Sequence, residues 1–221
     1  MTRAGISVQA LKCSMLTDAL GHRLPVRRDD DVVADLVPVG EWILDDHELV
    51  ATMARWRQES ASMFLVHFES TAQKTMTYLR DMSIADPARI LFIIYRDGVA
   101  KGHIGFSGVT DVDAELDNVM RGESTGVPGF MTAVSSTLIR WGFDELGVES
   151  IHLRATSHND SAIGLYSSLG FQLEESLPLQ AHHDGEFIVH RPCAEADADV
   201  DFRLQVMRLG REEFIEGLFR P

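Results

Sequence analysis

Residues 112–171 constrain the fold of this chain more than any other stretch of its sequence. They are typical of a strand, a glycine-containing loop, a long helix, a second strand, a short helix and the start of a third strand. From about residue 129 to 146, apolar side chains recur at a spacing that places them on one buried helix face: Phe130, Val134, Leu138 and Trp141. A glycine-bearing turn that opens a helix offers backbone N–H groups and the positive end of the helix dipole to an anion.

Three apolar runs before the long helix predict adjacent antiparallel strands. Residues 89–95 and 99–109 flank Asp97-Gly98, a strong signal for a tight hairpin turn. Residues 112–120 form the third run and lead into the loop.

Two helices are expected ahead of these strands. The first begins with Asp45 as its N-cap and ends near Ser60, with apolar residues on one face. The second is opened by a capping box from Ser70 to Gln73, and Asp86-Pro87 ends it.

The short helix near the end of the stretch carries the most specific pattern. Its residues follow N-x-x-A-x-x-x-Y-x-x-x-G-F, formed by Asn159, Ala162, Tyr166, Gly170 and Phe171. This run and the element order resemble the GNAT superfamily of acyl-CoA-dependent N-acyltransferases, over about residues 30–209. The resemblance implies the GNAT fold, an α/β (α+β) domain with a mixed, mostly antiparallel central sheet of about 6–7 strands and helices on both faces.

The expected domain organisation is simple. Residues 1–31 form an N-terminal arm or leading elements, and residues 32–221 form the acyltransferase domain. An insertion at about 174–200 is long for a connection between strands. It fits a hairpin or lid over the cleft equally as well as a mobile loop.

Charge and composition exclude several classes of partner. A formal charge of −14 argues against binding nucleic acid or an anionic membrane, because both need a basic patch. No apolar run is long enough to span a membrane, and the N-terminus lacks the apolar core of a signal peptide. Two distant cysteines, Cys13 and Cys193, favour a reduced, cytoplasmic protein. The sequence leaves open whether the chain forms a homodimer.

In the superfamily, a Q/R-x-x-G-x-G/A signature at the start of the third helix binds the pyrophosphate of acyl-CoA. By resemblance it falls on residues 126–131, where Gly129 matches, Gly126 replaces the usual Gln or Arg, and Met131 replaces Gly or Ala. The amides of Gly129, Phe130 and Met131 remain candidates for the pyrophosphate, and Arg121 or Arg140 for a supporting charge. The alternative to pyrophosphate binding is that the loop is an ordinary glycine- and proline-containing start of a helix that binds no ligand.

The resemblance also assigns roles around the thioester of acetyl-CoA. Asn159, with Ala162, would hold the pantetheine arm, and backbone N–H groups around Val119 and Met120 would polarise the thioester carbonyl. Tyr166 would be the general acid, because CoA leaves as a thiolate that a phenol can protonate. A capping Asn and a core Tyr are the structural alternatives.

The acceptor amine must be neutral to attack, so a base or a water relay is needed. Glu115 and Asp117 are two apart on one strand and share a face, where mutual repulsion favours proton uptake by one of them. A solvated strand face is the alternative. His103 on the preceding strand is the rival base and is also a candidate contact to the substrate.

By the resemblance, the link between the first two helices forms a wall of the acceptor cleft, where Phe64, His67 and Phe68 would face the substrate. The alternative is that these aromatic side chains pack in the core and that His67 has no role in binding. His182 and His183 are relevant only if the insertion folds over the site. No residue spacing indicates a metal site.

The function that these expectations describe is acetyl transfer from acetyl-CoA to a primary amine by direct attack. A small molecule, with an amino sugar or a nucleotide-linked amino sugar first, is the expected acceptor. One alternative is a peptide or protein amine. Another is a non-catalytic module that binds acyl-CoA, which the degenerate loop would favour.

Overall fold

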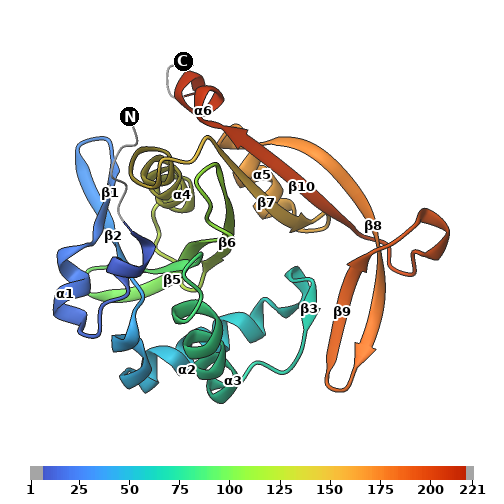
Figure 1. Cartoon of the computed structure of the whole chain (residues 1–221), viewed down its shortest axis with the longest axis horizontal. Coiled ribbons are helices and arrows are strands. Elements are labelled where there is room, and N and C mark those ends of the chain that lie inside the picture. Colours follow the sequence, from blue (N-terminus) through green and yellow to red (C-terminus); the bar gives the residue numbers. More distant parts are fainter. Residues whose placement is uncertain (1–6, 218–221) are drawn as a thin grey trace.

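The computed structural model describes residues 7–217, and a run of apolar strands forms its centre (Figure 1). Ten strands make one sheet in the order β1-β2-β4-β5-β6-β7-β10-β8-β9-β3. Helices lie on both faces, and all neighbouring strands are antiparallel except β6 and β7. The strands are β1 (Leu24–Arg28), β2 (Asp31–Pro38), β3 (Val66–His67), β4 (Ile90–Arg96), β5 (Val99–Ser107), β6 (Asp113–Arg121), β7 (Ser150–Thr156), β8 (Gln172–Asp184), β9 (Phe187–Pro192) and β10 (Arg203–Gly210).

The expected mixed, mostly antiparallel α/β sheet is confirmed, but the count of 6–7 strands is wrong. Residues 24–38 form the hairpin β1–β2, which adds to the edge of β4. At the other side, β8 is long enough to pair with β10 through its first half and with β9 through its second. The two-residue strand β3 then pairs with β9 and ends the sheet. Most of the expected insertion is therefore a hairpin.

The helices follow the apolar periodicity, although two of them begin one residue later than expected. Asp46, and not Asp45, caps α2, because Asp45 is still part of a preceding 3-10 turn. The Oδ1 of Asp46 accepts a hydrogen bond from Leu49 N at 3.0 Å. Thr71, and not Ser70, caps α3 through Lys74 N. The helices are α1 (Leu16–Gly21), α2 (His47–Glu59), α3 (Ala72–Tyr78), α4 (Phe130–Trp141), α5 (Asp160–Ser168) and α6 (Arg211–Gly217), with π-helical continuations of α3 over Leu79–Ile84 and of α4 over Gly142–Leu146.

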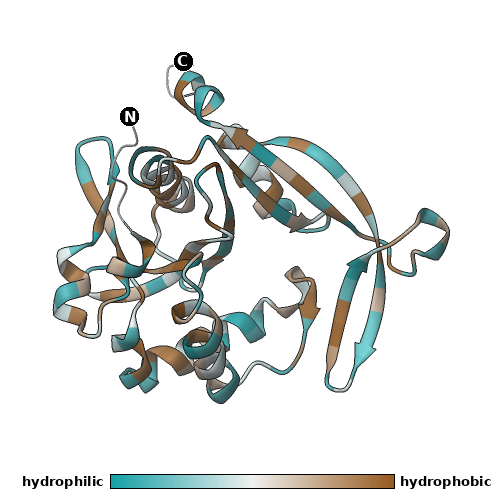
Figure 2. Cartoon of the chain, in the orientation of Figure 1, coloured by the Kyte–Doolittle hydropathy of each residue, from teal (hydrophilic) through white to brown (hydrophobic). Residues whose placement is uncertain are grey.

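Two apolar cores lie on opposite faces of the sheet. Successive residues of β4 alternate between them: Phe92 and Ile94 pack toward α4 and α5, whereas Leu91 and Ile93 pack toward α2 and α3. The central strands are accordingly among the most hydrophobic parts of the chain (Figure 2). Strand β6 contributes to both cores, with Ala114 and Leu116 in the first and Met120 in the second.

The parallel pairing of β6 and β7 is short. It covers three residue pairs, Asp113↔Ser150, Ala114↔Ile151 and Glu115↔His152, and the two strands are not paired beyond them. The sheet is thus split in its middle, next to the start of α4 and α5. Among residues 7–217, no helix is both long and apolar enough to cross a membrane.

Candidate active site

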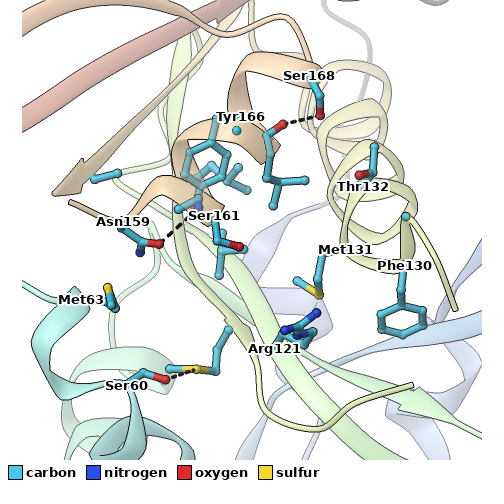
Figure 3. Close-up of a pocket in the computed structure, with 18 of the residues that line it drawn as sticks. Ser60, Met63, Arg121, Phe130, Met131, Thr132, Asn159, Ser161, Tyr166 and Ser168 are labelled. Carbon is cyan, nitrogen blue, oxygen red and sulfur yellow. Dashed lines mark hydrogen bonds between the residues drawn. The ribbon is translucent and has the colours of Figure 1, made fainter. Parts of the chain in front are cut away.

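A cleft of about 870 Å³ opens where β6 and β7 separate (Figure 3). Its walls come from the last part of β6, the loop 124–129, the first turn of α4, the end of β7, α5 and the link between α2 and α3. The segment 112–171 therefore supplies most of the cleft. Segments before it close the remaining side.

The loop end of the cleft is suited to an anion. Gly126 and Gly129 both have positive φ, +67° and +68°, which a side chain at Cβ would strain. Gly129 is the N-cap of α4 and offers no side chain to the first-turn amides, of which that of Phe130 donates to the Val127 carbonyl at 3.3 Å. Arg121 lines the same end of the cleft, and among residues 7–217 it makes no ion pair. Peptide N–H groups, helix dipole and guanidinium thus converge.

Helix α5 forms the wall opposite this loop. Asn159 caps it, because its Oδ1 accepts from Ala162 N at 3.2 Å, and both residues line the cleft. Tyr166 also lines the cleft but is only 7% exposed. Burial, with a contribution from the charge of Asp117, raises the pKa of the Tyr166 phenol far above its usual value. The phenol therefore carries its proton at neutral pH, as a general acid must.

Strand β6 bulges as it passes the cleft. Its pairing with β5 shifts between His103 and Gly105, and Asn118 has a φ of +54°, which is uncommon for a residue other than glycine. The bulge brings Asp117, Asn118, Val119 and Met120 successively to the cleft lining. The backbone of Val119 and Met120 therefore borders the split, where the thioester carbonyl was expected.

His103 lies behind the bulge and outside the cleft lining. Its Nδ1 donates to the Asn118 carbonyl at 2.8 Å, and its ring lies 6.3 Å from that of Trp56. Burial lowers the pKa of His103 to about 4, so the ring is neutral at pH 7. The structure gives this histidine a contact that supports the bulge.

The two carboxylates expected on one strand face are each paired with an arginine. Glu115 accepts from Arg154 through both oxygens, at 2.7 and 2.9 Å, and does not line the cleft. Asp117 lines the cleft and accepts from Arg89 Nη1 at 2.5 Å and from the Asn118 side chain at 2.9 Å. Arginine charges therefore offset the repulsion that the sequence suggested.

The Asp117 carboxylate belongs to a wider network. The hydroxyl of Tyr78, from the end of α3, accepts from Asn118 Nδ2 at 2.9 Å and lies 3.4 Å from Arg89 Nη1. Burial raises the pKa of Tyr78, which keeps it protonated. Tyr78, Arg89, Asp117 and Asn118 thus tie α3 and β4 to the bulge.

The link between α2 and α3 bridges the split in the sheet. On the β6 side, Ser60 Oγ contacts Met120 Sδ at 3.6 Å. On the β7 side, the carbonyls of Ser62 and Met63 accept from His158 at 2.9 Å and from Thr156 at 3.4 Å. Ser60, Met63 and Phe64 line the cleft as a result, and Figure 3 shows Ser60 and Met63 below Asn159.

Other predicted substrate contacts lie behind this bridge. His67 packs edge-on against His190 at 4.7 Å, and Phe68 packs against Phe187 at 5.5 Å. Neither His67 nor Phe68 lines the cleft, and neither do His182 and His183 on β8. Arg140 lines a separate hollow beside β1. Within residues 7–217 there is no cluster of metal-ligating side chains.

The cleft thus brings together residues from both ends of the predicted site. The lining includes nearly all the residues assigned to the cofactor and the proposed acid: Val119, Met120, Arg121, Gly126, Gly129, Phe130, Met131, Asn159, Ala162 and Tyr166. Sequence reasoning missed Arg89, Arg154 and Tyr78. Arg89 and Arg154 are marked only by their pairing with the strand-face carboxylates, and Tyr78 only by its bonds to Asn118 and Arg89. All of these contacts depend on how distant segments come together.

Comparison with known proteins places this architecture in a family. The family model of the acetyltransferase (GNAT) domain matches residues 41–172, more than half of the chain. The fold and the matched domain are those of an N-acetyltransferase. The chain belongs to the GNAT acetyltransferase family.

Solved structures share the fold at low sequence identity. A probable GNAT-family acetyltransferase from Chromobacterium violaceum is 18% identical, with a TM-score of 0.63 over 87% of this chain and 88% of the other. The spermidine N-acetyltransferase from Vibrio cholerae, solved with CoA and spermine, is 15% identical, with a TM-score of 0.63 over 84% of this chain and 99% of the other. None of the curated protein sequences matches this one.

Proposed function

We propose that this protein transfers an acetyl group from acetyl-CoA to the primary amine of a small molecule. One observation carries the proposal. A single cleft runs from the anion-binding start of α4, through the split between β6 and β7, to the buried phenol of Tyr166 and the α2–α3 link. A phosphorylated thioester can therefore enter at one end while an amine enters at the other.

Acetyl-CoA fits the residues along this path. Its pyrophosphate would meet the first-turn amide of Met131 and the guanidinium of Arg121, and also the amide of Phe130 if its bond to the Val127 carbonyl opened. The pantetheine arm would lie along α5, near Asn159 and Ala162. The acetyl carbonyl would then lie at the bulge, where backbone N–H groups of Val119 and Met120 would stabilise negative charge on its oxygen.

The reaction is a direct displacement. The amine lone pair forms the N–C bond, the C–S bond breaks as the tetrahedral intermediate collapses, and the CoA thiolate leaves. Tyr166 gives its proton to that sulfur, and the proton lost by the amine returns to solvent. Asp117 is the better placed carboxylate for the amine, because it lines the cleft and Glu115 does not. With Asp117 already accepting from Arg89, a water relay is the simplest path for the amine proton.

The bridge over the cleft favours a small acceptor over a peptide. The α2–α3 link is tied to β6, to β7 and, through β3, to the hairpin β8–β9. His190 N donates to Leu65 O at 2.8 Å, and Lys74 pairs with Glu186, so the hairpin tip is also attached. An extended peptide would need this link to detach. The first candidates are amino sugars and their nucleotide-linked forms, and the solved spermidine acetyltransferase crystallised with spermine is an example of a small amine acceptor.

The test has two stages. Calorimetry should show saturable binding of acetyl-CoA, and thiol release should then rise with one class of small primary amine and not with peptides. Binding without thiol release across the panel would favour a non-catalytic acyl-CoA-binding module.

We further propose a cytoplasmic location, because both cysteines are unpaired in the structure. Light scattering would measure whether the chain forms a homodimer.

A further inference from the structure

An arginine without a counter-charge lies behind Phe64, outside the lining of the cleft. The guanidinium of Arg57, on α2, stacks over the ring of the cleft-lining Phe64 at 3.6 Å from its centroid and lies 5.1 Å from that of Phe68. Its Nη2 donates to Val66 O at 2.6 Å. Its Nη1 is buried, and within residues 7–217 no group accepts a hydrogen bond from it.

The other basic side chains at the acceptor end of the cleft are neutralised. Arg89 pairs with Asp117, Arg154 with Glu115 and Lys74 with Glu186. Arg57 forms no ion pair among the described residues, although the chain carries a formal charge of −14. A guanidinium that is buried without a carboxylate destabilises the protein, and the chain has ample acidic residues to avoid this.

A second polar atom beside Arg57 also has no partner. His67 Nε2 is buried and unpaired within the described residues, and burial, His190 and Arg57 lower the pKa of its ring. Leaving a buried donor or acceptor without a hydrogen-bond partner destabilises the folded protein. Burial lowers the pKa of Arg57 to about 10, which still leaves it charged at neutral pH. Phe64, on which Arg57 stacks, lines the cleft, whereas Arg57 and His67 do not.

We infer that the acceptor amine carries an anionic group, a carboxylate or a phosphate, which binds Arg57 and His67 while the amine lies at Asp117. This inference rests on the proposed acetyl transfer and narrows its substrate class. Arg57 serves the acceptor end as Arg121 serves the cofactor end. The anion would reach these two residues only after the Phe64 ring turned aside, which is part of the proposal. Polyamines, which bring only positive charge, are then poor acceptors.

Binding of inorganic phosphate tests this without knowledge of the acceptor. Protein saturated with CoA, so that the loop end is filled, is titrated with phosphate in the wild type, Arg57→Gln and the control Arg80→Gln, whose side chain is exposed and pairs only with Asp81. We expect saturable binding in the wild type and in the control, weakened roughly tenfold or more in Arg57→Gln. Equal binding in all three proteins, or none in the wild type, would overturn the inference and would indicate that Arg57 holds only water.

A paired acceptor panel gives the second measurement. Glucosamine 6-phosphate is compared with glucosamine, and spermidine serves as the cationic amine. Preference for the phosphorylated sugar that Arg57→Gln abolishes, with unchanged affinity for acetyl-CoA, supports the inference. An equal loss for all amines, or a preference for spermidine, contradicts it. Failure of the wild type to bind CoA would instead contradict the proposed function itself. The variant Arg57→Lys keeps the charge, and its thermal unfolding separates loss of recognition from loss of folding.

Discussion

Arg89 donates a hydrogen bond to the carboxylate of Asp117, joining the start of β4 to the bulge of β6 at the floor of the cleft. The arginine side chain is 19% exposed and that of Asp117 33%, so water screens the pair only in part. The same guanidinium lies beside the Tyr78 hydroxyl, which in turn accepts from Asn118. The pair therefore supports the uncommon backbone conformation at Asn118, on which the proposed position of the thioester depends.

The first prediction concerns this pair. Arg89→Leu and Asp117→Asn, combined in a double-mutant cycle, should show a coupling free energy of unfolding of about 1–3 kcal/mol. Chemical denaturation measures it. The exposed pair Arg80–Asp81 is the matched control and should show no measurable coupling, because water screens it. Equal coupling in both pairs would mean that Arg89 does not fix the bulge.

Tyr166→Phe tests the general acid. Removing the hydroxyl should lower turnover roughly 100-fold, because the thiolate then leaves without a proton donor. Affinity for acetyl-CoA should stay nearly constant, since the ring and its packing against Phe171 remain. Thiol release and calorimetry measure the two quantities. Because burial raises the pKa of Tyr166, the turnover of the wild type should not decline through this group at mildly alkaline pH. Wild-type turnover in the variant would remove Tyr166 from this role.

His103 predicts how stability depends on pH. Its pKa is about 4 in the folded protein and about 6.5 in the unfolded chain, so the unfolded chain binds more protons between these values. The contribution of the neutral His103 ring to the free energy of unfolding is therefore fully present above pH 6.5 and is lost as the pH falls toward 4. The variant His103→Asn keeps a donor for the Asn118 carbonyl. Between pH 7 and 4.5 its free energy of unfolding should fall by about 2–3 kcal/mol less than that of the wild type. Parallel curves in denaturant titrations would contradict the prediction.

The hairpin β8–β9 should determine acceptor size. Replacing residues 180–191 with a short Gly-Ser turn removes the partner of β3 and frees the α2–α3 link. The KM for a small amine should rise roughly fivefold, since the wall that orients it is less fixed. Acetyl-CoA affinity should not change, because no residue of the hairpin lines the cleft. Peptide amines that become substrates would support the bridge as the selective element, whereas unchanged KM values and unchanged peptide rejection would exclude it.

The sequence predicts the middle of the fold well because its signals there are local. The apolar periodicity of α4 and the run from Asn159 to Phe171 need only neighbouring residues to be recognised. The extra strands depend on distant partners. Val66 and His67 form a strand only because β9 lies beside them, and two residues carry no periodicity of their own. The one-residue shifts of the two helix caps reflect a competing 3-10 turn before α2 and the extended backbone of Thr71 before α3.

The candidate site divides in the same way. A spacing motif located Tyr166 and Asn159, and the structure places both in the cleft with the loop. Strand alternation placed Glu115 and Asp117 on one face, but it could not show that Arg154 and Arg89 neutralise them. Those pairs require the register of β7 and the path of the chain into β4. Arg57 was missed for a further reason: its significance lies in the missing counter-charge.

Binding of acetyl-CoA to the cleft tests the central claim most directly. Met131 lies at the loop end, and Met131→Glu would place a carboxylate against the pyrophosphate; Met82→Glu, at an exposed position outside the cleft, is the control. By calorimetry, the wild type and the control should bind one acetyl-CoA per chain with a Kd in the micromolar range, and Met131→Glu should bind roughly tenfold more weakly or worse. No binding by the wild type, or equal binding by all three proteins, would contradict the account.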